Sequence, residues 1–157
     1  MNSRLIASIA IGAAVLLGTT GCSMLATQAT AIPYSAAEGV TVPNSGPLQV
    51  RNAFIVANED GSAGNLVAAI VNPTDDDQTL RIEFGESPDT VTASVRVPAN
   101  SVVSLGSGED DPLLLEGVEM LPGTDIPGFF ESGDATGALV AVPILDGALP
   151  YLESLVP

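Results

Sequence analysis

The chain has 157 residues, of which nineteen are acidic and four basic, and its formal net charge is −15. This acidic balance argues against nucleic acid as a partner, because phosphate recognition needs a basic face that releases counterions. The chain has neither histidine nor lysine. This composition excludes histidine-dependent nucleophilic catalysis, a P-loop lysine, and zinc or copper sites built from nitrogen and sulfur ligands. We therefore expect a non-catalytic protein without a cofactor.

The N-terminus has the pattern of an export signal. A short start with Arg4 precedes the uncharged run 5–17, and small residues then lead to Cys22. A positive start, an apolar segment of about 7–15 residues and a small-residue exit are typical of a secretory signal. A permanent membrane span would need about 20 apolar residues. We expect residues 1–21 to be a signal peptide whose apolar part forms a helix.

Cys22 is the only cysteine, so it cannot form an internal disulfide. The sequence Thr20-Gly21-Cys22 after the apolar run resembles the lipobox of bacterial lipoproteins, although Thr19 stands where that family most often has leucine. The resemblance implies cleavage before Cys22 and a diacylglyceryl group on its thiol. Two acyl chains are enough for stable anchoring. The protein is then expected on the outer face of the cell membrane.

Two other fates of the N-terminus stay open. Ala29-Thr30-Ala31 matches the A-x-A cleavage pattern, and cleavage after Ala31 would release a secreted, soluble domain without a cysteine. An uncleaved signal anchor is the other alternative, and the short apolar run disfavours it.

Residues 22–46 are rich in Ala, Thr, Ser and Pro and show no sustained period, which predicts a flexible tether. The boundary is open, because Tyr34 and residues 40–42 can also dock as a first edge strand. Three arginines and nineteen acidic residues lie after Cys22, which gives this part a net charge of −16. Such a charge favours solubility and argues against electrostatic adhesion to anionic lipid.

Residues 47–157 predict one all-β domain. The segment 65–72 is apolar on both faces, as in a central strand, whereas 78–84 and 90–97 alternate, as in half-buried antiparallel strands. Pro143 suggests that the last strand ends at a sheet edge. Residues 146–157 form a tail that can lie across the sheet. The expected strands are 48–57, 65–72, 78–84, 90–97, 101–106 and 137–145.

Short strands with turns every 8–12 residues favour a single antiparallel, immunoglobulin-like β-sandwich. The segments "PLQVRNAFIV", "GNLVAAIVNPTDDDQTLRI" and "ALVAVPIL", behind a tether, are similar to LpqE-type envelope lipoproteins of high-GC Gram-positive (actinobacterial) bacteria. These proteins in turn resemble the copper-chaperone-like sandwiches of the bacterial periplasm. The resemblance covers most of residues 48–145 and implies the fold. It does not imply copper binding, because the copper family uses paired histidines and methionines, and only Met24 and Met120 follow the signal here.

Two acidic runs are candidate metal sites. Asp75-Asp76-Asp77 and Glu109-Asp110-Asp111, with Glu59-Asp60, supply the oxygen ligands that calcium prefers, provided that two loops meet at one end of the sandwich. Neither run has the spacing of an EF-hand loop, and solvated turn charge is the simpler interpretation.

Phe129 and Phe130, beside Gly128, are a candidate interaction tip. Paired aromatic residues after a turn more commonly fill a core, so this alternative is kept beside it.

The sequence as a whole predicts an exported, lipid-anchored cell-envelope protein. Its β-sandwich is expected to bind an unidentified envelope protein or small ligand, or to support envelope organisation. The alternatives are an acidic-loop calcium-binding module and the secreted soluble domain.

Overall fold

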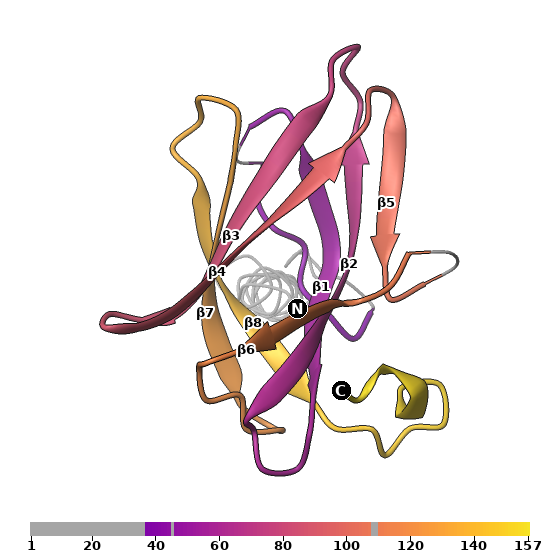
Figure 1. Ribbon diagram of the computed structural model, residues 1–157. Helices are drawn as coiled ribbons and strands as arrows, with labels where there is room; N and C mark the ends of the chain where they lie inside the picture. The colour runs from indigo at the N-terminus through magenta and orange to yellow at the C-terminus, as the bar shows by residue number, and fades with distance from the viewer. Residues whose placement is uncertain (1–36, 45, 108–109) are drawn as a thin grey trace, which may run out of the picture. The chain divides into compact units, whose positions relative to one another are not determined.

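The computed structural model describes residues 37–44, 46–107 and 110–157 (Figure 1). The predicted signal peptide, Cys22 and most of the predicted tether lie outside these residues. The described part is all-β, as predicted, with eight strands and one turn of 3-10 helix. Among these residues, no helix is long and apolar enough to cross a membrane.

The strands are β1 (Gln49–Ala57), β2 (Ala63–Asn72), β3 (Gln78–Glu86), β4 (Asp89–Val97), β5 (Ser101–Leu105), β6 (Leu113–Glu116), β7 (Asp125–Ser132) and β8 (Ala138–Leu145), followed by the 3-10 turn η2 (Glu153–Leu155).

The strands form one sheet in the order β4-β3-β7-β8-β1-β2-β5, and β6 pairs with β2 beyond the end of β5. All pairs are antiparallel except β1 and β8, which run parallel where Ile55 meets Ile144. The sheet is therefore mixed, whereas a purely antiparallel one was expected. It curls so that β3, β4 and β7 face β1 and β2 across the core (Figure 1). The closer likeness to immunoglobulin folds stays a prediction.

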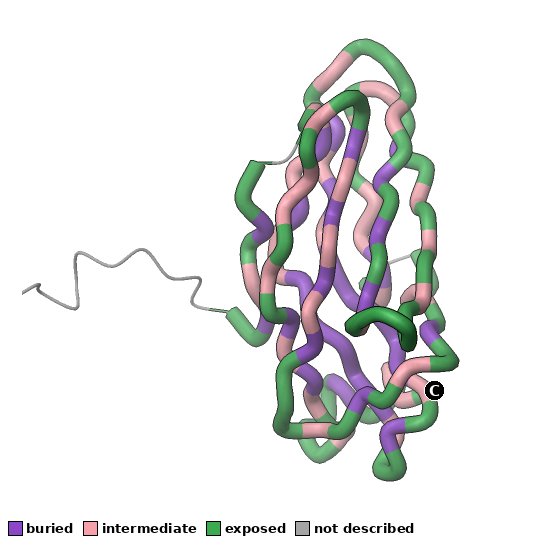
Figure 2. The backbone as a smooth tube through the Cα atoms, turned by 90° about the vertical axis from the view of Figure 1, so that its left-hand side faces the viewer, coloured by how far each residue is buried: buried purple, intermediate pink, exposed green. Residues whose placement is uncertain are grey.

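The core follows the period-two pattern of the strands. Leu80, Ile82 and Phe84 of β3 are buried while the residues between them are exposed, as their alternation predicted. Figure 2 shows this alternation of buried and exposed residues along the strands. Phe84 packs edge to face on Phe130 of β7, with ring centroids 5.8 Å apart. Each such buried side chain contributes about 1.5–3 kcal/mol, so the core holds the two halves of the curled sheet together.

Part of the predicted tether packs on the domain. Val40 forms an isolated bridge with Ala53, and Val42 is buried in the core. The Oδ1 atom of Asn52, which lies at a bulge in β1 with a φ of 51°, accepts a hydrogen bond from the Gly39 amide at 2.8 Å. Of the two alternatives left open for residues 40–42, docking on the sheet is the one observed.

The C-terminal tail covers the outer face of β1 and β2. Leu152 is buried against Phe54, Val56 and Val67, which point away from the main core. The Asn65 side-chain amide donates to the Leu155 carbonyl at 2.9 Å. The tail lies across the sheet, as predicted.

Other features of the sheet also differ from expectation, and the short β6 was not among the expected strands. β7 was not predicted, because Pro127-Gly128 has the composition of a turn. Gly128 is needed inside the strand, since a Cβ atom there would lie 2.8 Å from the Phe84 ring. β8 was expected to end at an edge, but it lies between β7 and β1. Pro143 is the last residue of β8 that pairs with β7, opposite Asp125, and the next residue, Ile144, pairs with Ile55 of β1.

Candidate functional site

The first predicted calcium run lies in the loop between β2 and β3, where its carboxylates bind the neighbouring turn. Asp77 accepts hydrogen bonds from the Arg96 guanidinium at 2.6 Å and from the Ala99 amide at 2.9 Å. The Arg96 bond, and then the Ala99 bond, hold the pKa of Asp77 below its usual value. Asp75 accepts a hydrogen bond from the Asn100 side chain at 3.0 Å. These bonds fasten the loop to the turn after β4, and Asp76 is exposed beside them.

The second predicted run follows β5. Asp110 accepts a hydrogen bond from the Ser104 amide at 2.9 Å, Asp111 is exposed, and Glu109 lies outside the described residues. The two loops lie at opposite ends of β5. Ser101, at its start, pairs with Asn72, which precedes the first loop, whereas Leu105, at its end, leads into the second loop. At about 3.3 Å per residue the two loops lie well over 10 Å apart. Across the described ranges, no group of three or more acidic side chains converges closely enough to hold a metal ion.

Phe129 and Phe130 lie within β7 and form no tip. Phe130 is fully buried, so the core alternative applies to it. Phe129 points the other way, is half-buried on the outer face of the sheet, and packs beside Gly137. The tip prediction is wrong because the dipeptide occupies a strand, which directs its two rings to opposite faces.

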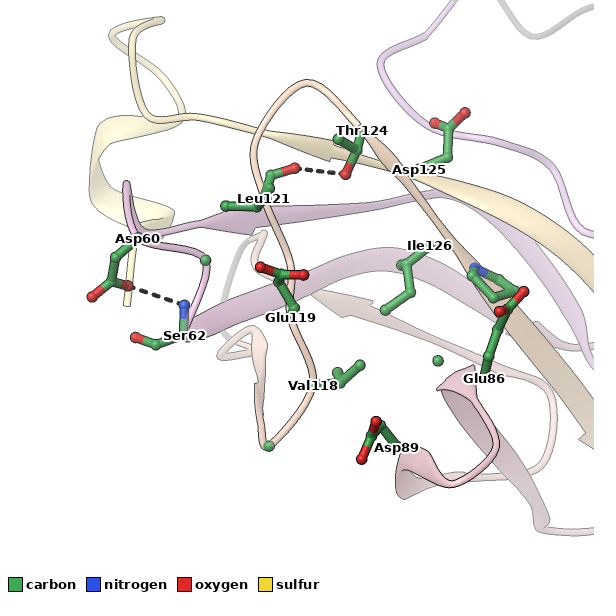
Figure 3. A pocket seen from close by; sticks show the side chains of 14 residues that line it. Asp60, Ser62, Glu86, Asp89, Val118, Glu119, Leu121, Thr124, Asp125 and Ile126 are labelled. Atoms are coloured by element: carbon green, nitrogen blue, oxygen red, sulfur yellow. Dashed lines mark hydrogen bonds between the residues drawn. The ribbon is translucent and has the colours of Figure 1, made fainter.

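One hollow is an open acidic groove of about 790 Å³, close to the turns after β1 and β3 (Figure 3). Figure 3 shows its carboxylates spread around the rim: Asp60 and Asp125 point away from the centre, and Glu119 and Asp89 lie on either side of Val118. Bonds from the Ser62 side chain and amide lower the pKa of Asp60. Five carboxylates and no basic side chain line the groove, so it can attract cationic groups but presents no converging ligand set. Except for Asp60, sequence analysis did not single out these residues, because they come from separate turns.

A second candidate is the outer face of β4, β3, β7 and β8, which we call the open face. Strand register places Thr92, Glu83, Phe129 and Leu139 in one row across it. Ser94, Arg81 and Glu131 form the next row. Leu139 is 68 % exposed, the highest value among the large apolar side chains of the described chain.

Two shallow hollows lie on the open face, one on each side of Phe129 and Leu139. One, of about 370 Å³, is lined by residues of β3, β4 and β7, including Arg81 and Phe129. The other, of about 310 Å³, is lined by residues of β7 and β8, including Leu139, with Glu86 at its edge. The open face thus offers apolar side chains between shallow hollows, with charged groups around them. Sequence analysis missed this face. Leu139 lies in a strand that is apolar throughout, so only the order of the strands shows that its side chain is on an exposed face.

No protein-family model matches the chain, and no curated protein shows significant similarity to it.

Proposed function

We propose that the protein is exported, carries a diacylglyceryl group on Cys22, and displays its β-domain at the outer face of the cell membrane as a non-catalytic module that binds a protein partner. The lipid anchor is supported by the lipobox-like Thr20-Gly21-Cys22 after a short apolar run. Two acyl chains give stable anchoring without any basic patch, which suits a chain this acidic.

The contrast between the two outer faces of the sheet carries the binding proposal. The C-terminal tail covers the outer face of β1 and β2, where Leu152 is 2 % exposed. On the open face, Leu139 is 68 % exposed and Phe129 half-buried, and no described segment covers them. Exposed apolar groups rimmed by polar residues mark protein interaction sites, and aromatic side chains supply a large part of binding energy there.

The charges around the open face define the chemistry of the partner. Glu83 and Glu131 flank Phe129, and Glu86 and Asp125 lie at the edge near Leu139, whereas Arg81 is the one basic side chain among the residues that line these hollows. Complementarity then favours a partner that presents an apolar side chain surrounded by lysine or arginine.

The test places a photo-crosslinking residue at position 139 in intact cells, with position 149 as the matched control. Leu149 is also exposed (46 %) but lies on the tail, away from the open face. We expect one protein to be crosslinked at position 139 and not at position 149. The yield at position 139 should fall when Phe129→Ala is added to the chain that carries the crosslinking residue, because Phe129 lies beside that position. Raised salt should also weaken capture, because rim charges are screened. The same products from both positions would contradict the proposal.

A further inference from the structure

The two edges of the sheet are unequal. One edge consists of β5 and β6, which have five and four residues and share the side of β2. The other edge is β4, which has nine residues and pairs only with β3 among the described strands. The β3–β4 register runs without a bulge from Gln78 opposite Val97 to Glu86 opposite Asp89. One side of β4 is therefore a long, regular edge.

Within the described part of the chain, this edge lacks the protection that edges usually carry. Proteins blunt their edges with short strands, lysine, proline, bulges or covering segments. Residues 90–95 of β4 are Thr, Val, Thr, Ala, Ser and Val, with no charge, proline or glycine. At the C-terminal end of β4, the Val97 carbonyl already has a partner, because the Asn72 side chain donates a hydrogen bond to it at 3.1 Å. Unpaired amide and carbonyl groups in a sequence of high β-propensity are suited to pairing with another strand.

We propose that β4 pairs antiparallel with β4 of a second copy of this chain, about a two-fold axis at Ala93. A two-fold axis in an antiparallel pair sets one residue opposite its own equivalent, and Ala93 is the middle residue of β4. This register pairs residues 90–96 of the two copies and leaves Val97, whose carbonyl already has a partner, outside the seam. It also matches the faces, because residues directly opposite each other point to the same side of a sheet.

The side chains at this seam are complementary. On the core side Val91 meets Val95 of the second copy, and on the outer side Thr92 meets Ser94. β-branched and hydroxyl pairs of this kind favour cross-strand pairing. The outer row then runs from Arg81 and Ser94 of one copy to Thr92 and Glu83 of the other, as the β3–β4 register requires. Arg81 of one copy and Glu83 of the other thus lie in the same row, with the two hydroxyl side chains between them.

Charge also selects this edge for a second copy. The part of the chain after Cys22 has a net charge of −16, so two copies repel each other over most of their surfaces. Two of its three arginines, Arg81 and Arg96, lie on the β3–β4 hairpin. Pairing there brings the copies together where two arginines offset part of the acidic charge, and it joins their open faces into one continuous surface.

Cysteine crosslinking tests the register in full-length chains extracted in mild detergent. Cys22 is replaced by Ser throughout, so that each introduced cysteine is the only thiol and the result does not depend on the lipid anchor. Thr92→Cys and Ser94→Cys chains are mixed under mild oxidation. Opposed residues lie about 4.5–5.5 Å apart, within reach of a disulfide, whereas two copies of residue 92 lie on a diagonal of about 7–8 Å, beyond the usual limit.

The proposal expects disulfide-linked dimers from the mixture, and from Ala93→Cys alone, with little product from Thr92→Cys alone or from Asp134→Cys in the exposed turn after β7. It also expects the uncrosslinked Cys22→Ser chain to sediment at twice the monomer mass. A monomeric mass, with mixture yields no higher than those of Asp134→Cys, would overturn the pairing. Efficient linking of Thr92→Cys to itself would overturn the register, and linking of Ala93→Cys to a different protein would overturn the choice of a second copy.

Discussion

The Asn72 side chain fastens the corner of the sheet at which β2 ends and β4 passes into β5. It is 1 % exposed, and its Nδ2 lies within hydrogen-bonding distance of the Asp76, Val97 and Pro98 carbonyls, at 2.8, 3.1 and 2.9 Å. Its Oδ1 accepts from the Thr74 amide and hydroxyl. One side chain therefore satisfies backbone groups from two loops that are distant in sequence.

Asn72→Ala is expected to lower the free energy of unfolding by about 2–3 kcal/mol, because it leaves buried carbonyl groups without donors. Asn58→Ala is the matched control, since its bonds to Ser62 and Ala63 lie nearer to solvent. Its cost should be nearer 1 kcal/mol. Chemical denaturation measures both, and equal losses in the two variants would contradict this role of Asn72.

The Asp77–Arg96 pair predicts a pH dependence of stability. The pKa of Asp77 is lowered in the folded protein, so its stabilising contribution is present above the unfolded value of about 3.9 and is lost as pH falls through the folded value. Asp77→Asn should melt below the wild type at neutral pH, and this gap should close as pH is lowered from 5 through about 3. A gap of constant size over that range would show that the ion pair is not its source.

At the scale of elements, the strands with alternating polar and apolar residues could be predicted from the sequence, but the strands with which they pair could not. β3 and β4 were visible because polar and apolar residues alternate along them without interruption. β7 was not predicted, because Pro127-Gly128 has the local composition of a turn. The glycine is required by the Phe84 ring, which is distant in sequence and leaves no room for a side chain at position 128. The central position of β8 depends in the same way on long-range pairing, which local composition does not encode.

The docking of the C-terminal tail predicts a matched pair of leucine variants. Leu152→Ala removes a side chain buried against Phe54, Val56 and Val67, and it should cost about 2–3 kcal/mol of unfolding free energy. Leu149→Ala, on the same tail but 46 % exposed, should change it by less than about 0.5 kcal/mol. Similar effects of both variants in denaturant unfolding would mean that the tail is not held by Leu152.

At the scale of the whole molecule, the N-terminal pattern and the strand composition suggest where the domain is displayed, but the candidate binding surface depends on topology. Leu139 and Phe129 are ten residues apart, and the strands that set Glu83 and Thr92 beside them lie more than thirty residues earlier in the chain. The predicted acidic runs were found at sites in the sequence where charges are adjacent, yet the acidic groove is assembled from charges that are separated along the chain. The grouping of such distant residues on one surface depends on the order of the strands.

The central claim is that Cys22 carries the lipid that holds the domain at the membrane. The most direct test is the intact mass of the protein extracted from its native membrane, beside its Cys22→Ala variant. We predict a chain that begins at Cys22 and carries a diacylglyceryl group, with this lipidated species absent from the variant. A lipid-free chain that begins at Ile32 would contradict the anchor and identify a secreted domain instead.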